Sequence, residues 1–414
     1  MATTTAPVAG ARSRNSKVVR TGNSPARVLF LEPNDDGTVG GSYQVLYDFV
    51  RHLDRSRYEP VVVFYQDNRF VEQLRAEGIA VHLLTSMWQR ERNAMRSGRL
   101  FRQGRTFLGS IWRRARFLRR ENIDLLHVNS TPQTGQDDWL PAARLVGVPA
   151  VATCAINVSV DVGSRMQRAL MRSYARVFPV SAHVARQLVA FGFPAERVIT
   201  IHPGIDLESF RTRVRTAPEI TRALLGVEPD AVLVTLVGNV RRWKGHHVAI
   251  EALRLLSPED RRAIRLVLAG ATAARDTSYE RELRDTVVAA GLEEQVTFLG
   301  HRDDIPDLMA ASDVVLHASI EPEPFGLVVV EGMALGRCVL ASELGGPAEI
   351  LQERAGATFS PERPAELAEI LSTLIRDPSR RRSASQGAAR EAERFHIATT
   401  VAATTRVYDQ LLRR

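Results

Sequence analysis

The sequence predicts an α/β protein of two domains, each built on a parallel sheet. Short apolar runs, such as residues 60–65 and 124–128, alternate with segments of helical length along most of the chain. This alternation is typical of a parallel sheet that carries helices on both faces. The length of 414 residues allows two domains that each bury their own core.

The composition indicates the class of protein and its cellular compartment. Hydrophobic residues make up 44% of the chain and charged residues 25%, as in a soluble globular protein. Cys154 and Cys338 lie far apart inside apolar runs, which indicates a reducing compartment and not a disulfide framework. No apolar run reaches the roughly 18 residues of a membrane span. Residues 1–24 have the composition of a disordered basic tail and not of a signal peptide, so we expect a cytoplasmic protein.

The first domain is expected to begin with a strand at residues 27–31, a glycine-containing loop and a helix. The loop holds Gly37, Gly40 and Gly41, and glycines let a backbone approach a ligand closely. Because the loop lacks the Gly-x-Gly-x-x-Gly fingerprint, an ordinary tight turn is an open alternative. Further strands are expected at residues 80–84, 149–153 and 176–180.

Polar side chains occur where these strands are expected to end. They are His127, Asn129, Thr153, Asn157 and Ser181. Ligands of doubly wound sheets bind beyond the carboxyl ends of the strands, so these side chains are candidates for ligand contacts. We expect His127 to pack within the sheet or at the strand end, with a role as a base as the alternative.

Residues 88–120 have the most unusual composition, with eleven arginines against the single acid Glu91. Apolar residues recur there at three- and four-residue spacing, which predicts helical structure, although Gly98, Gly104 and Gly109 argue against one continuous helix. One interpretation is a helix that covers the sheet with a solvated arginine face. The other is an interfacial helix on an anionic membrane, where each basic residue contributes about 1 kcal/mol. The formal net charge of +8 favours polyanionic surfaces.

The second domain is expected to open with a strand at residues 231–237 and a basic loop. The loop contains Gly238, Arg241, Arg242 and Lys244. Lysine otherwise occurs only at position 17, so an internal lysine in an arginine-rich chain suggests a packed phosphate contact, with chance under a codon bias as the alternative. Cations over a glycine turn could stabilise negative charge on a diphosphate.

Residues 323–349 are the stretch around which the second domain is organised. Pro324 and Gly326 are expected to end a strand. Residues 327–335 have the composition of a buried helix, and Gly336 is expected to stop it. Past this stretch we expect the chain to be helical to its end.

The start of the predicted helix offers an anion site framed by two carboxylates. The free backbone N–H groups of Gly326, Leu327 and Val328 would point outward with the positive end of the helix dipole, where a phosphate or diphosphate can bind. Glu331 would lie about one turn into the helix, where it could accept hydrogen bonds from ribose hydroxyls. Glu323 would precede the helix. Surface glutamates are common, so this pair alone is a weak signal.

Together with Phe325 and Gly326 between the glutamates, and Gly345 and Gly346 at the next helix, the stretch resembles the signature of family-4 retaining glycosyltransferases. The resemblance implies a GT-B fold, in which two Rossmann-like doubly wound domains face each other across a cleft. It also implies a nucleotide-sugar donor bound mainly by the C-terminal domain, and transfer with retention at the anomeric carbon. Neither a metal nor a cofactor is expected.

The resemblance implies a domain organisation that covers nearly the whole chain. An acceptor-side domain is expected at residues 25–210, a linker at 211–230 and the donor-binding domain at 231–390. Residues 391–414 are expected to form a helix that returns to the first domain.

Within the basic loop, the resemblance is to a Gly-Arg-x-x-x-x-Lys-Gly pattern that holds the donor phosphates. Gly238 and Lys244 match this pattern. The position of the family arginine holds Asn239, so Arg241 or Arg242 would have to substitute for it.

Other donor contacts are implied by the same resemblance. Gly40 and Gly41 would face the donor phosphates and the acceptor, residues 325–327 would contact the diphosphate, and Arg302 belongs to a strip that would cradle the nucleotide base. One position departs from the family pattern, because the histidine of a Thr-x-His arrangement is replaced by Ala155. No catalytic base is therefore assigned to the first domain.

The resulting hypothesis is a retaining transfer to an acceptor hydroxyl in cell-envelope, lipid-linked or exopolysaccharide glycan synthesis. Lys244 and Arg241 would hold the diphosphate, and Glu323 would lie against the sugar hydroxyls. The acceptor would attack from the face of the departing phosphate, whose oxygen takes the proton. Glu323 as a covalent nucleophile is a less favoured alternative.

Two other classes of protein are alternatives. A nucleotide-sugar 2-epimerase-like isomerase could share the fold, but those enzymes carry different motifs. A nucleic-acid-binding protein could use the arginine-rich segment, but it would leave the motifs of the second domain unexplained and the sequence offers no aromatic stacking platform. We therefore expect no nucleic-acid partner.

Overall fold

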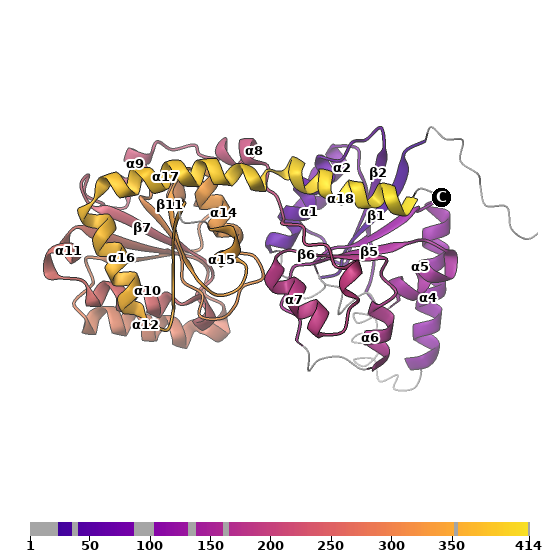
Figure 1. Cartoon of the computed structure of the whole chain (residues 1–414), viewed down its shortest axis with the longest axis horizontal. Coiled ribbons are helices and arrows are strands. Elements are labelled where there is room, and N and C mark those ends of the chain that lie inside the picture. Colours follow the sequence, from indigo (N-terminus) through magenta and orange to yellow (C-terminus); the bar gives the residue numbers. More distant parts are fainter. Residues whose placement is uncertain are drawn as a thin grey trace, which may run out of the picture.

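The computed structural model describes residues 24–34, 40–86, 103–130, 138–159, 165–351 and 355–412. Two α/β domains lie side by side along the long axis of the molecule (Figure 1). Each contains a six-stranded sheet, with the strand orders β3-β2-β1-β4-β5-β6 and β12-β11-β10-β7-β8-β9. All strand pairs are parallel, and helices lie on both faces of each sheet. This confirms the predicted fold class of two facing doubly wound domains.

The N-terminal domain contains the first sheet. Its strands are β1 (Ala26–Glu32), β2 (Tyr58–Phe64), β3 (Ala80–Leu83), β4 (Leu125–Val128), β5 (Ala150–Cys154) and β6 (Arg176–Pro179). Its helices are α1 (Gly41–Arg51), α2 (Arg69–Ala76), α4 (Gln103–Arg120), α5 (Trp139–Val146), α6 (Arg165–Met171) and α7 (Ala182–Ala190), with the short turn η1 (Ala195–Arg197).

The C-terminal domain contains the second sheet. Its strands are β7 (Val232–Val237), β8 (Ile264–Ala269), β9 (Val296–Gly300), β10 (Val314–His317), β11 (Cys338–Ser342) and β12 (Gly356–Phe359). The helices are α8 (Leu207–Arg211), α9 (Pro218–Leu224), α10 (His246–Leu255), α11 (Pro258–Arg262), α12 (Thr277–Ala289), α13 (Ile305–Ala311), α14 (Leu327–Ala334), α15 (Pro347–Ile350), α16 (Pro364–Arg376) and α17 (Pro378–Ala392), with the short turns η2 (Arg242–Lys244), η3 (Ala274–Asp276) and η4 (Glu393–Phe395).

The central strands read as continuous apolar runs because both of their faces are covered. Residues 28–31 of β1 and 314–316 of β10 are buried on both faces, as expected for parallel sheets beneath two helical layers. The expectation that the chain is helical after the 323–349 stretch is wrong at β12. This short edge strand lacks an apolar run, and it pairs with β11 where Gly356 packs against the backbone of Val339.

The last helix, α18 (Ile397–Leu412), crosses from the C-terminal domain onto the N-terminal domain (Figure 1). The carboxylate of Asp409 accepts hydrogen bonds from Arg57 at 2.6 Å and from the Tyr58 hydroxyl at 2.7 Å. At the crossing point, Gly204 lies so close to Ile397 that a Cβ atom would be 2.7 Å from its Cα. The helix therefore ties the two domains together.

The arginine-rich segment is described only from residue 103 onward, and residues 88–102 lie outside the described residues. From 103 to 120 it is one helix, α4, so the expectation that Gly104 and Gly109 interrupt the helix is wrong. Packing of α4 against its own domain compensates for the low helix propensity of glycine, because Ala115 and Leu118 are buried. Among the described residues, none of the helices has the length and apolarity to cross a membrane.

Candidate active site

A pocket of about 400 Å³ lies between the two domains. The strands of both sheets end toward this pocket, where doubly wound domains bind ligands. The N-terminal wall includes Gly41, Ser42, Asn129, Ser130, Thr153 and Ala155, and the C-terminal wall includes Val237, Lys244 and residues 323–328. Of the predicted site residues, the pocket thus brings together Glu323, Lys244, Gly41, Phe325, Gly326 and Leu327.

A hydrogen-bonded cluster around Glu323 forms the polar part of the C-terminal wall. The Glu323 carboxylate accepts hydrogen bonds from Lys244 Nζ and the Ser319 hydroxyl, and it contacts His317 Nε2. Burial of Glu323 raises its pKa, but the hydrogen bonds and charges of His317 and Lys244 lower the pKa by more, so that it falls to about 2. Glu323 is therefore ionised at neutral pH.

Sequence reasoning missed the role of His317 in this cluster. The side chain is almost fully buried, and it reaches Glu323 from the last residue of β10. A signal was present, because a histidine at the carboxyl end of a strand six residues before Glu323 is placed where ligands bind.

The basic loop presents Lys244 to the pocket by means of two glycines. Gly245 has a φ of 70°, and a Cβ atom there would lie 1.8 Å from the carbonyl oxygen of Ala318. Only glycine allows the loop to approach the end of β10 this closely. A Cβ atom on Gly238 would lie 3.5 Å from Cδ of Lys244, so this glycine packs next to the lysine side chain. Gly238 itself does not line the pocket.

The two arginines predicted to assist Lys244 lie outside the pocket lining. Arg242 forms an ion pair with Glu282 of α12 and stacks over the Tyr279 ring at 4.6 Å. Arg241 is 3.9 Å from Asp276. Their contact with donor phosphates stays a prediction, and for Arg242 it would require the Glu282 pair to open.

Two helix N-termini, those of α1 and α14, meet at the pocket. Their N-cap residues are Gly40 and Gly326, and neither has a side-chain cap. A Cβ atom on Gly41 would lie 2.7 Å from Leu327 Cδ1, so the two helices touch across the domain interface. The first N–H groups of each helix have no intrahelical partner, and both dipoles favour an anion. This geometry brings the predicted loop at Gly40 and Gly41 next to the predicted anion site of α14, and phosphate binding there stays a prediction.

Phe325 contributes to the site through its backbone. Its ring is buried and packs against Phe395 and His202, with ring centroids 5.9 Å apart in each case. Phe395 lies in η4, and His202 lies between η1 and α8, where the chain passes from the first domain to the second. The side chain thus fixes the position of the loop relative to both domains.

Glu331 and Arg302 do not line the pocket. Glu331 lies in the second turn of α14, and burial raises its pKa to about 7 despite the opposing charge of Arg213. Arg302 is paired with Asp304 at 2.8 Å on an exposed turn. Their predicted contacts with the ribose and the base stay predictions.

The N-terminal wall is built on a pair of buried polar groups. Asn129 donates its amide hydrogens to Glu32 Oε2 at 2.5 Å and to the carbonyl of Ser42 at 3.2 Å. Both partners are acceptors, which fixes the orientation of the amide. Burial raises the pKa of Glu32 to about 7. Sequence reasoning singled out Asn129 but missed Glu32, which lies at the end of a buried strand and has no local motif.

His127 packs as expected and does not face the cleft. Its ring contacts the Tyr408 hydroxyl of α18 and the Thr153 hydroxyl at 2.8 Å. Complete burial lowers its pKa to about 3, so the ring is neutral. Ala155 lines the pocket and presents only a methyl group at the position where the family pattern has a histidine.

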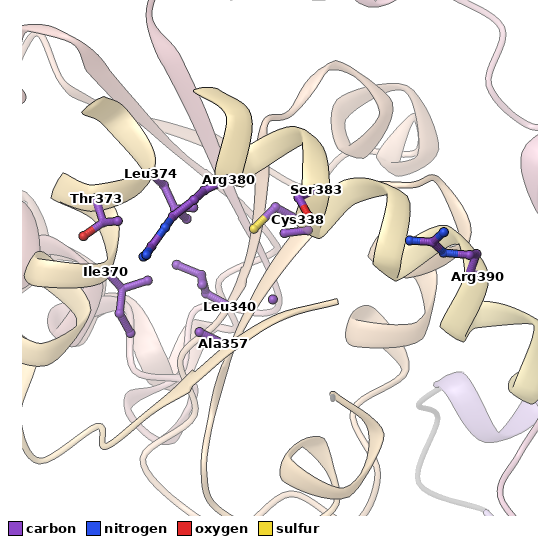
Figure 2. A pocket seen from close by; sticks show the side chains of 11 residues that line it. Cys338, Leu340, Ala357, Ile370, Thr373, Leu374, Arg380, Ser383 and Arg390 are labelled. Carbon is purple, nitrogen blue, oxygen red and sulfur yellow. The ribbon is translucent and has the colours of Figure 1, made fainter. Parts of the chain in front are cut away.

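A larger pocket of about 650 Å³ lies elsewhere in the C-terminal domain (Figure 2). Its floor includes Cys338 and Leu340 of β11, and α16 and α17 form its walls. Cys338 is the first residue of its strand, so this pocket lies toward the amino ends of the sheet. Its lining contains arginines and hydroxyls but no carboxylate. The interdomain pocket is the better candidate for chemistry.

Two doubly wound domains with a pocket between them are the architecture of a GT-B protein. Two family models match the chain, "Glycosyltransferase Family 4" over residues 39–209 and "Glycosyl transferases group 1" over residues 219–391. Between them they cover most of the chain. The protein belongs to the family-4 glycosyltransferases of the GT-B fold.

Curated relatives include D-inositol 3-phosphate glycosyltransferases. The one from Streptomyces bingchenggensis is 31% identical over 54% of this chain and 50% of its own length, and the one from Saccharomonospora viridis is 28% identical over 74% of each. The chain thus matches half to three quarters of the length of these relatives.

Solved structures agree with the fold. HepE of Anabaena in complex with UDP has a TM-score of 0.76 and 26% identity, and the match covers 93% of this chain and 100% of that one. A glycosyltransferase from Rickettsia africae has a TM-score of 0.79 at 18% identity, covering 94% and 99% of the two chains, and it supports the fold alone.

Proposed function

We propose that this protein is a retaining, metal-independent glycosyltransferase that moves a sugar from a uridine diphosphate donor to an acceptor hydroxyl. The observation that carries the proposal is the pocket in which Lys244, Glu323 and two uncapped helix N-termini converge. The UDP and UDP-glucose complexes of HepE support the choice of donor. The acceptor would be a glycan or a lipid-linked saccharide of the cell envelope.

The proposed donor contacts follow from charge. The diphosphate would lie at the N-termini of α1 and α14, and Lys244 would turn from Glu323 toward it as the donor binds. Negative charge builds on the diphosphate when the glycosidic bond breaks, and a fixed cation and oriented N–H groups stabilise that charge. Glu323 would keep its contact with His317 and accept a hydrogen bond from the sugar. Glu331, in the second turn of α14, would take the ribose hydroxyls.

In the proposed transfer step, the acceptor oxygen forms a bond to the anomeric carbon on the face from which the diphosphate leaves. The bond between that carbon and the phosphate oxygen breaks, and the departing oxygen takes the acceptor proton. No protein base is required, which fits a wall that offers Ala155 and a neutral amide at Asn129.

The test is a panel of nucleotide-sugars with the purified protein. We expect a UDP-sugar to raise the unfolding temperature and to release UDP slowly in the absence of acceptor. Loss of both effects in a Lys244→Ala variant would place them at this site. Binding of no nucleotide-sugar would refute the proposal. Appearance of an isomerised nucleotide-sugar without acceptor would favour the isomerase alternative.

A peripheral membrane role is part of the proposal. On α4, Leu108 and Trp112 are 60% and 62% exposed, and four arginines of the same helix are also exposed. The arginines are Arg113, Arg116, Arg119 and Arg120. Exposed apolar groups beside cations are typical of helices that lie on anionic membranes, and such a site would bring the enzyme to a lipid-linked acceptor.

Vesicle co-sedimentation tests this role. We expect binding to vesicles with anionic lipid, weaker binding to zwitterionic vesicles, and a loss of about tenfold when Leu108 and Trp112 are both changed to serine. Leu145→Ser on the neighbouring helix α5 is a matched control, because this leucine is also exposed. Equal binding by the double variant and the control would refute the role of α4.

A further inference from the structure

The start of α7 in the N-terminal domain is hydrogen-bonded to the loop at Pro324 and to helix α15 of the C-terminal domain. The Ser181 hydroxyl donates to the carbonyl of Pro324 at 2.6 Å. The Glu349 carboxylate accepts from the backbone N–H groups of Ala182 at 2.7 Å and His183 at 2.6 Å. All three bonds cross the domain interface beside the pocket.

The carboxylate at the N-terminus of helix α7 belongs to the other domain. The helix has no acidic residue in its own first turn. Ser181 is its N-cap and accepts from Val184 N–H at 3.2 Å, while Glu349 occupies the position where a carboxylate interacts favourably with the helix dipole. When the domains separate, this end of α7 loses its carboxylate and the Ser181 hydroxyl loses its acceptor.

The turn in front of α15 is joined to the loop that carries Glu323. Gly346 N–H donates to the Glu323 carbonyl at 2.8 Å, and a Cβ atom on Gly345 would lie 2.3 Å from that same oxygen. On the other side, the Asn157 amide of the N-terminal domain donates to the Pro322 carbonyl at 2.7 Å. The loop that carries Glu323 is therefore held by hydrogen bonds from the opposite domain on both sides of the carboxylate.

We infer that Ser181 and Glu349 are positioning residues that couple closure of the cleft to the placement of Glu323. They do not line the pocket. Each of these contacts joins one domain to the other, so separation of the domains would break them and release the Glu323 loop. This inference rests on the proposed function for its kinetic part, whereas its structural part concerns the free protein.

The experiment compares Glu349→Gln and Ser181→Ala with Glu343→Gln, an exposed glutamate of the same region that serves as the control. Small-angle X-ray scattering of the free proteins measures the separation of the domains. We expect the two interface variants to have a larger radius of gyration than the wild type and the control. Identical scattering curves for all four proteins would overturn the inference, whatever the donor proves to be.

Kinetics with UDP-glucose as the probe give the second readout. We expect Glu349→Gln to lower kcat by at least tenfold and to change UDP affinity by less than threefold, with a nearly unchanged unfolding temperature. A parallel fall of kcat, UDP affinity and unfolding temperature would indicate a merely structural role and overturn the inference. If the wild type neither binds UDP nor turns over UDP-glucose, the proposed donor fails, and the scattering comparison alone decides the coupling.

Discussion

The two walls of the interdomain pocket differ in chemistry. The C-terminal wall presents the ion pair of Lys244 and Glu323, with His317 in contact with the Glu323 carboxylate. The N-terminal wall presents the amide of Asn129 and the methyl group of Ala155, with the carboxyl of Glu32 buried behind them. Every diphosphate donor presents the same charged group to its binding site, whereas many different polar groups can bind an acceptor hydroxyl. The C-terminal wall, which is proposed to bind the diphosphate, is the one whose sequence resembles a family signature.

The largest expected effect on turnover comes from removing the positive charge of the C-terminal wall. Lys244→Ala should lower turnover of a UDP-sugar by about 10²–10³-fold, because a preorganised charge beside the leaving diphosphate is lost. Initial rates of UDP release measure this. Arg254→Ala is the control, since this exposed arginine of α10 is paired with Glu251 and does not line the pocket. Equal losses in the two variants would show that the walls are not divided as proposed.

A smaller effect is expected on the opposite wall. Asn129→Ala should reduce acceptor-dependent turnover by about tenfold, the equivalent of one lost hydrogen bond of about 1.4 kcal/mol. UDP affinity, measured by calorimetry, should change by less than twofold. A large loss of UDP affinity would place Asn129 on the donor side and remove the contrast between the walls.

The smallest effect concerns Glu331 and depends on pH. Its pKa of about 7 means that the carboxyl is neutral in mildly acidic solution and ionised above pH 7. If the ionised form binds the ribose, UDP affinity of the wild type relative to Glu331→Gln should rise a few-fold between pH 6 and 8. Taking this ratio cancels the titration of UDP itself. A ratio that is independent of pH would exclude the ribose contact.

The raised pKa of Glu331 also predicts how the free energy of unfolding depends on pH. The folded-state pKa of Glu331 is raised above its reference value of 4.5, so its stabilising contribution is complete below pH 4.5 and is lost as the pH rises through 7. Glu331→Gln should therefore gain stability relative to the wild type between pH 5 and 8, by about 3 kcal/mol at most. Urea unfolding at both pH values measures this difference, and a constant difference would contradict it.

The sequence by itself determined the features that depend on near neighbours in the chain. The strand at residues 314–317, the turn at Gly326, the helix behind it and its stop at Gly336 follow from apolar runs and from the backbone freedom of glycine. The parallel sheets follow from the alternation of such runs with helices. Lys244 could be singled out because it is an unusual residue in a local loop.

Only the tertiary structure decided which distant groups meet. The contact of Lys244 with Glu323 joins residues 79 positions apart, and the bond between Glu32 and Asn129 joins residues 97 positions apart. The capping of α7 by Glu349 spans more than 160 positions. These pairings depend on how two sheets and their loops pack across a cleft, and no local pattern of apolar and polar residues encodes that packing.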